Sequence, residues 1–284
     1  MAGSATRRRA TARRSAAATL VGLGMTALAQ GGAAQESGAI VTDRPDQTES
    51  ARSVRAGRFQ LELGWLLTAE DAGGSRARTH AIAGALLRIG LGAGVEARVG
   101  FDGWIRGEER PGPAPSAEVI REGAGDAALG LKWALRDGER LDPAVALLGA
   151  VSLPVGAGEL SSGRADPDLR LLVSHDLADR VSLGYNLGVA WETETTAGGG
   201  GRTLTDALYT LSLGLGLAET VGVFMEGFGF LGLSADRPDR HSLDGGLTIR
   251  LRENLQLDAS AGVGLNEAAE DWLVGAGVSF RLPR

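Results

Sequence analysis

The sequence contains no cysteine, only three histidines, and few aromatic residues, which make up 5% of its 284 residues. The absence of cysteine excludes disulfide bonds, thiolate catalysis and cysteine-ligated metal sites. Apart from a short apolar run near the start, no stretch is apolar over the roughly 18 residues that a transmembrane helix needs. The fold must therefore be held by hydrogen bonds and packing, and it can cross a membrane only by strands.

The scarce histidines give little support to an enzyme. His80, His175 and His241 are far apart and follow no metal-binding spacing. His175 follows Ser174 and His241 precedes Ser242, but neighbours on a strand point to opposite faces, so neither pair predicts a hydrolase site. We expect no enzymatic activity, no catalytic residue, no cofactor and no metal; a barrel hydrolase is the least favoured alternative.

Residues 1–29 have the features of a cleaved signal peptide. Five arginines precede an apolar run from Ala16 to Ala29, which ends in the small-residue motif Ala27-Leu28-Ala29. The run is shorter than a membrane anchor requires. Without these five arginines the chain has 24 basic and 35 acidic residues, a net charge of −11, which argues against nucleic acid as a partner.

The region 168–192 shows the clearest periodicity in the chain. From Val181 to Glu192, apolar residues alternate without interruption with small or polar ones. A period of two residues indicates β-strands, and the Leu-Ala-Asp-Arg sequence at 177–180 indicates a tight turn between two of them. Similar turns recur at 217–221 and 251–255. This repetition predicts a series of hairpins.

Strands of this kind can be followed from Phe59 to the end of the chain. About twelve are predicted, at 59–68, 78–88, 94–104, 123–135, 143–153, 167–177, 180–192, 204–217, 220–231, 241–251, 254–265 and 272–282. The predicted fold class is all-β: a transmembrane up-and-down antiparallel β-barrel. The expected organisation is a signal peptide (1–29), a polar N-terminal lead-in segment (30–58) and an outer-membrane β-barrel (59–284).

The connections predict which end of the barrel faces outward. Those expected to be long are 69–77, 107–122, 154–166, 193–203, 232–240 and 266–271, and they alternate with brief ones. Long external loops and short periplasmic turns are typical of outer-membrane barrels in Gram-negative bacteria.

Charged residues recur on the small-residue faces of the strands. A charge facing lipid costs about 2–4 kcal/mol for Arg or Lys at mid-depth, so we expect these residues to face the lumen. The candidate lumen-lining residues are Glu62, Arg98, Asp126, Lys132, Asp168, Arg170, Glu226, Asp244, Arg250 and Asp258. They could form a solvated, mutually neutralising interior or a path that selects solutes.

Glu226 differs from the other candidates in its neighbours. Phe224, Phe228 and Phe230 have the same parity and would place aromatic rings beside its carboxylate. Such a patch could contact a hydrophobic solute or pack against an inserted segment.

The polar stretch 40–58 precedes the first strand and has no sustained period. It could be a periplasmic lead-in. Alternatively it could enter the barrel mouth, with Asp43, Arg44, Asp46 and Glu49 paired to lumen charges. The sequence leaves both possibilities open.

Several stretches together resemble a known family. They are Ile40 to Ser50, Gly57 to Glu62, Gly125-Asp126 before Gly130-Leu131-Lys132, and Val151 to Gly156. They resemble the outer-membrane transporter family named after the meta-pathway of phenol degradation, over nearly all of the chain after the signal peptide. The resemblance implies a porin-like channel or transporter for small compounds, aromatic or hydrophobic ones among them. One departure is the C-terminus, where Phe280 is followed by four further residues instead of ending the chain.

The functional expectation is a passive outer-membrane channel. Its expected partners are outer-membrane lipid, a small-molecule solute, periplasmic chaperones and the barrel assembly machinery. The alternative is a structural or adhesive barrel with a closed lumen, because twelve strands lie between small filled barrels and open porins.

The signal peptide yields the first prediction. Mature protein should begin at Gln30 and fractionate with the outer membrane, because signal peptidase cleaves after an A-x-A motif. N-terminal sequencing of the membrane fraction tests this. Full-length chain recovered in the cytoplasm would contradict it.

Overall fold

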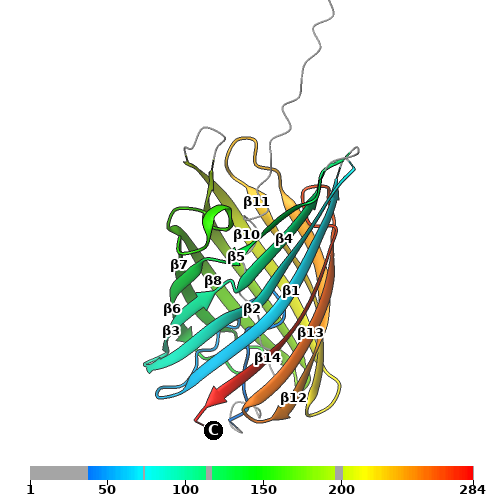
Figure 1. The fold of residues 1–284 in the computed structure, drawn as a ribbon. Helices are drawn as coiled ribbons and strands as arrows, with labels where there is room; N and C mark the ends of the chain where they lie inside the picture. Colours follow the sequence, from blue (N-terminus) through cyan, green and yellow to red (C-terminus); the bar gives the residue numbers. More distant parts are fainter. Residues whose placement is uncertain (1–37, 73, 113–116, 196–200, 284) are drawn as a thin grey trace, which may run out of the picture.

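The computed structural model describes residues 38–72, 74–112, 117–195 and 201–283, which form a closed β-barrel (Figure 1). The strands are β1 (Phe59–Ala72), β2 (Ser75–Gly92), β3 (Val95–Phe101), β4 (Trp104–Arg110), β5 (Val119–Ala124), β6 (Ala127–Arg136), β7 (Ala144–Leu153), β8 (Asp166–Ala178), β9 (Val181–Thr195), β10 (Gly201–Gly216), β11 (Val221–Gly232), β12 (Arg240–Arg252), β13 (Leu255–Gly264) and β14 (Trp272–Leu282). One turn of 3-10 helix, η2 (Gly158–Leu160), lies between β7 and β8.

These fourteen elements make a barrel of twelve strands within the described residues. β3 and β4 are separated only by Asp102 and Gly103, and both pair with β2. β5 and β6 are separated only by Gly125 and Asp126, and they pair with β4 and β3. Each of these two pairs of elements is thus one barrel strand with a break, and the predicted all-β antiparallel barrel of about twelve strands is confirmed.

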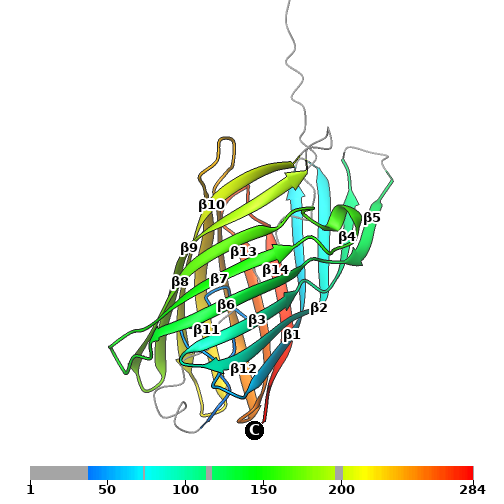
Figure 2. The ribbon, with the colours of Figure 1, turned by 90° about the vertical axis from the view of Figure 1, so that its left-hand side faces the viewer.

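The barrel closes where its first and last strands meet. β1 pairs antiparallel with β14 from Phe59↔Leu282 to Ala69↔Trp272, and on its other edge it pairs with β2. Closure satisfies the backbone hydrogen bonds of both terminal strands, which a sheet in lipid requires. Phe59 and Leu282 also place the start and the end of the barrel at the same rim (Figures 1 and 2).

Alternation along each strand separates an apolar outer face from a polar inner face. On β6, Leu129, Leu131 and Trp133 are 49%, 58% and 53% exposed, whereas Lys132 is fully buried. The same contrast separates Met225 from Glu226 on β11. An exposed apolar exterior around a buried polar interior is the pattern of a barrel whose outside contacts lipid. None of the described residues forms a helix long and apolar enough to cross a membrane.

The connections at the two rims differ less in length than predicted. The long loop expected at 69–77 is wrong, because β1 continues to Ala72 and β2 starts at Ser75. Half of the loop expected at 107–122 belongs to β4 and β5. On the other rim the connection from Arg136 to Ala144 is longer than the tight turns beside it. Where the strands extend beyond their predicted ends, their backbone N–H and C=O groups bond to the neighbouring strand instead of to water.

The difference in connection length that remains between the two rims still predicts which rim of the barrel faces outward. Glu159, in the long connection between β7 and β8, is exposed, and so is Asp179, in the tight turn between β8 and β9 at the opposite rim. Because the chain has no native cysteine, Glu159→Cys and Asp179→Cys each create a single thiol. An impermeant maleimide should label Glu159→Cys on intact cells and Asp179→Cys only after lysis. The reverse labelling pattern would invert the orientation.

Candidate functional site: the segment inside the barrel

Residues 39–58 run inside the barrel near the rim where β1 starts and β14 ends (Figure 2). They are called the inserted segment. The segment enters beside the β12–β13 turn, where the Ile40 backbone N–H donates to the Glu253 carbonyl at 2.6 Å. It leaves where the Gly57 N–H donates to the Gly90 carbonyl at 3.1 Å, just before β1 begins. Hydrogen bonds and ion pairs join the segment to strands on all sides of the barrel, so the segment spans the lumen near this rim.

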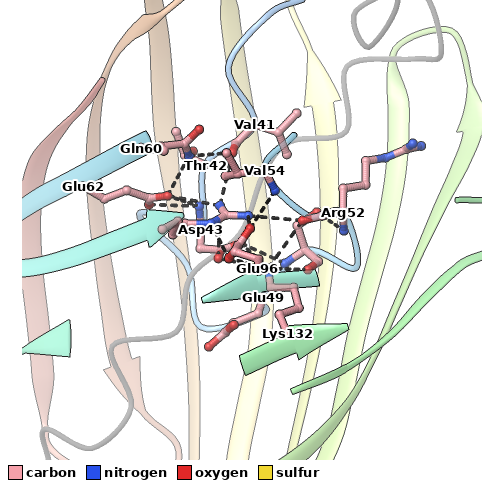
Figure 3. Close-up of polar contacts among 12 residues, drawn as sticks. Val41, Thr42, Asp43, Glu49, Arg52, Val54, Gln60, Glu62, Glu96 and Lys132 are labelled. Carbon is pink, nitrogen blue, oxygen red and sulfur yellow. Dashed lines mark hydrogen bonds and ion pairs between the residues drawn. The ribbon is translucent and has the colours of Figure 1, made fainter. Parts of the chain in front are cut away.

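Asp43 is the centre of the contacts between the segment and the wall (Figure 3). Its fully buried carboxylate lies 3.1 Å from Arg88, 2.7 Å from Arg98 and 3.2 Å from Lys132, which belong to β2, β3 and β6. Burial alone would raise the pKa of Asp43, but the positive charges of Arg88, Lys132 and Arg98 outweigh burial and hold this pKa well below its usual range. Asp43 is therefore ionised at every physiological pH.

Two wall carboxylates complete this cluster. Glu62 on β1 accepts hydrogen bonds from the backbone N–H groups of Asp43 and Arg44, both at 2.9 Å, and lies 3.2 Å from Arg88. Glu96 on β3 lies 2.9 Å from Arg88 and accepts a 2.7 Å hydrogen bond from the Val54 N–H. The segment thus supplies backbone donors as well as charge, and few polar groups in this cluster are left unpaired.

The tip of the segment is bound to the opposite wall. Thr48 donates to Glu226, and the Gln47 N–H donates to the same carboxylate at 2.6 Å. Asn186 on β9 exchanges two hydrogen bonds with the backbone of Glu49, at 2.6 and 3.0 Å. These contacts reach β9 and β11, across the lumen from Asp43.

Glycines on the inner face make room for Arg44. A Cβ at Gly64 would lie 2.0 Å from the Arg44 guanidinium, and one at Gly277 would lie 2.2 Å from its Nε. The two glycines face each other across β1 and β14. Arg44 then reaches Asp258 on β13 at 3.1 Å.

Other candidate lumen residues lie apart from this cluster. Arg170 pairs with Asp168 at 3.0 Å and approaches Glu49 at 3.6 Å. Arg250 donates to the Glu219 carbonyl at the rim. Asp126 accepts hydrogen bonds from Gly156, Ser161 and Ser162 in the β7–β8 connection.

Asp46 and Asp244 lie near the tip of the segment. Asp46 accepts a 2.8 Å hydrogen bond from Ser212 on β10. Asp244 lies directly opposite Glu226 in the register of β11 and β12.

Arg88 is missing from the candidates inferred from sequence. A bulge at Ala83, whose φ is 56°, shifts the register of β2 against β1. Before the bulge the odd-numbered residues of β2 face the lumen, and after it the even-numbered ones do. Arg88 therefore faces the lumen, although His80, also even-numbered, faces outward. A uniform alternation cannot reveal such a residue.

A second charged cluster lies towards the other rim. Arg237, in the β11–β12 connection, lies 2.7 Å from Asp206, contacts Glu192, and lies 2.9 Å from Glu194. Arg240 lies 3.0 Å from Asp206, and its guanidinium is 4.6 Å from the ring centroid of Phe230. This rim cluster joins β9, β10 and β12.

No metal site is apparent in this arrangement. The part of the chain that the structure describes contains no group of three or more His, Cys, Asp or Glu side chains that could hold a metal ion. The interior chemistry is ion pairing and hydrogen bonding.

A closed twelve-stranded antiparallel barrel with an apolar exterior and a charged interior defines a β-barrel of the outer-membrane type. The family described as "Putative MetA-pathway of phenol degradation" matches residues 42–282, most of the chain, including the inserted segment from Thr42. The chain belongs to this family.

Solved structures with the same architecture include three outer-membrane barrels. The translocator domain of the autotransporter NalP from Neisseria meningitidis is 12% identical, with a TM-score of 0.52 over 78% of this chain and 87% of that one. The transport unit of the autotransporter AIDA-I from Escherichia coli is 8% identical, with a TM-score of 0.52 over 84% and 92%. The NanC porin is 8% identical, with a TM-score of 0.51 over 78% and 98%. The likeness is one of fold, and a comparison with curated proteins gave no match.

Removing the charge of Asp43 should destabilise the protein strongly. Asp43→Asn leaves Arg88, Arg98 and Lys132 with less negative charge in a buried site, and the expected loss is roughly 3–5 kcal/mol. Asp71→Asn, which removes only an exposed ion pair, should cost less than about 1 kcal/mol. Urea unfolding of both variants in detergent micelles measures the difference. Equal shifts would show that Asp43 does not hold the segment.

Proposed function

We propose that the protein is an outer-membrane channel for small hydrophobic compounds, aromatic ones among them. The supporting observation is a band of uncharged inward side chains on β10 and β11, between the two charged clusters. Along β10 the inward residues run from Thr210, at the segment, through buried Leu208 to Asp206, in the rim cluster. Along β11 they run from Glu226 through Phe228 to Phe230.

The band suits a solute that carries no charge. In the strand register Phe228 lies between the hydroxyl residues Thr210 and Ser242, and Phe230 lies between Leu208 and Arg240 of the rim cluster. Burying apolar solute surface against them contributes about 25 cal/mol per Å². The family description, which refers to phenol degradation, supports small aromatic solutes for this band.

The inserted segment would act as the gate of this channel. It occupies the half of the lumen beyond Thr48, so a solute that has entered the band can leave at that rim only when the segment moves. Its contacts with the wall are mostly polar, so water can replace them when the segment leaves, and displacement is compatible with an intact barrel.

The features of the N-terminal sequence also support a proposal for export and assembly. We propose that residues 1–29 are removed as a signal peptide, that 30–58 form the N-terminal segment, and that 59–284 form the barrel. Periplasmic chaperones and the barrel assembly machinery would deliver and insert it, as the outer-membrane fold requires.

A closed barrel with a structural or adhesive role is the second candidate. The ion pairs around Asp43 favour it, since Asp43 and Lys132 are fully buried and a static network of this kind could simply fill the lumen. Transport measurements distinguish the two functions.

Flux into proteoliposomes should depend on Phe228. Toluene or phenol should enter faster than a polar solute of similar size, and Phe228→Asp should reduce this flux about tenfold, because it places a charge in the apolar band. Met225→Leu, a change on the lipid-facing side of the same strand, should leave the flux unchanged. Absence of flux in the wild type and in Asp43→Asn would favour the closed barrel.

A further inference from the structure

The inserted segment meets the barrel wall on two sides that differ in charge balance. Around Asp43 every acid lies near an arginine or lysine. At the tip of the segment the wall presents Glu226 on β11 and Asp244 on β12, directly opposite each other in register. Like charges opposite each other across two strands are destabilising, and burial increases the effect.

Neither of these two wall carboxylates has a cationic partner within the described residues. Glu226 is fully buried and Asp244 is 4% exposed, and no ion pair there reaches either of them. Both oxygens of Asp244 are buried and accept no hydrogen from a protein donor. Such a group needs either a cation or a proton.

The charged groups around the pair do not neutralise it. On the segment, Asp46 adds negative charge, while Arg44 is engaged by Asp258 of β13. On β12 itself, Arg240 binds Asp206 near one rim, and Arg250 binds the Glu219 carbonyl near the other rim. The β10 residues nearest the tip, Thr210 and Ser212, contribute only hydroxyl groups.

A shared proton resolves this arrangement. Glu226 and Asp244 are directly opposite each other on β11 and β12, so one proton between their carboxyl groups turns repulsion into a hydrogen bond. The described residues offer no three-ligand metal site as an alternative. We propose that Glu226 and Asp244 share one proton when the inserted segment is docked, and that this proton makes docking pH-dependent.

The segment explains why the proton is linked to docking. The Gln47 N–H and the Thr48 hydroxyl donate to Glu226, so the docked segment covers the pair and holds it away from water with one proton between the two carboxyl groups. When the segment leaves, water can solvate both carboxylates and the proton is released. The docked state then binds one proton more than the released state, so docking is complete at low pH and weakens by up to about tenfold per pH unit as the pH rises through the titration of the pair. This conclusion concerns docking and holds for any transported solute.

Labelling of a thiol in the segment measures docking directly. Ala51 is 1% exposed, and Ala51→Cys creates the only thiol in the chain. Refolded full-length mature barrel in vesicles is treated with a water-soluble maleimide across pH, and the rates are divided by those of the exposed control Ala56→Cys. This ratio removes the pH dependence of the thiol itself.

Asp244→Asn and Asp258→Asn form a matched pair in this background. Both remove a buried carboxylate on neighbouring strands, but only Asp258 has an arginine partner from the segment. Asp244→Asn, which mimics the protonated group, should slow labelling and abolish its pH dependence. Asp258→Asn leaves Arg44 unpaired, so it should speed labelling while the pH dependence remains. Glu226→Gln should also abolish the pH dependence.

Two results would overturn the proposal. One is a wild-type labelling ratio that does not rise with pH; if that labelling also slows on addition of calcium and recovers with chelator, a metal cation takes the place of the proton. The other is Asp244→Asn labelling faster than wild type while heat-modifiable gel mobility shows an intact barrel.

Discussion

The interior of this barrel depends on one buried carboxylate, that of Asp43. Arg88, Arg98 and Lys132 project from three different strands into the lumen and meet at this group. Without it the wall would enclose three positive charges with only Glu62 and Glu96 to balance them, and uncompensated buried charge is among the most destabilising features a protein can have. The wall and the segment are thus complementary parts of one polar core. This core is polar because the hydrophobic residues of the strands face outward.

Placing the charges inside also determines where the small residues lie. Gly64 and Gly277 lie where Arg44 packs on the inner face of the wall, and a Cβ at Gly90 would lie 2.0 Å from the carbonyl oxygen of Arg55. These glycines are therefore part of the contact surface for the segment. The high glycine content, 44 residues, reflects in part a wall that must accept a chain packed against its inner face.

The inward side chains of β10 and β11 change in chemistry along the barrel axis. The inserted segment and its ion pairs occupy the lumen near one rim, the Arg237 cluster joins three strands near the other rim, and Leu208 and Phe228 lie between them. The balanced side around Asp43 holds the segment tightly. The unbalanced side at Glu226 and Asp244 is the one where the charge state can change, because no basic side chain fixes it. A firm anchor and an adjustable contact on one segment are what a gate requires.

The sequence by itself determined the class of fold, the strand order and which strand faces are polar, because a two-residue period and tight turns are local properties of the chain. Lys132, Glu226 and Asp43 could be selected as residues of interest for the same reason. Only the tertiary structure decided that residues 39–58 lie inside the barrel, since the polar composition of this segment suits water as well as a wall of matching charges. It also decided the role of Arg88, because the bulge at Ala83 changes which residues of β2 face the lumen. It decided too that β1 and β2 continue through a region where a loop was expected. Pairing between distant strands sets these features, and alternation within one strand carries no information about its partner.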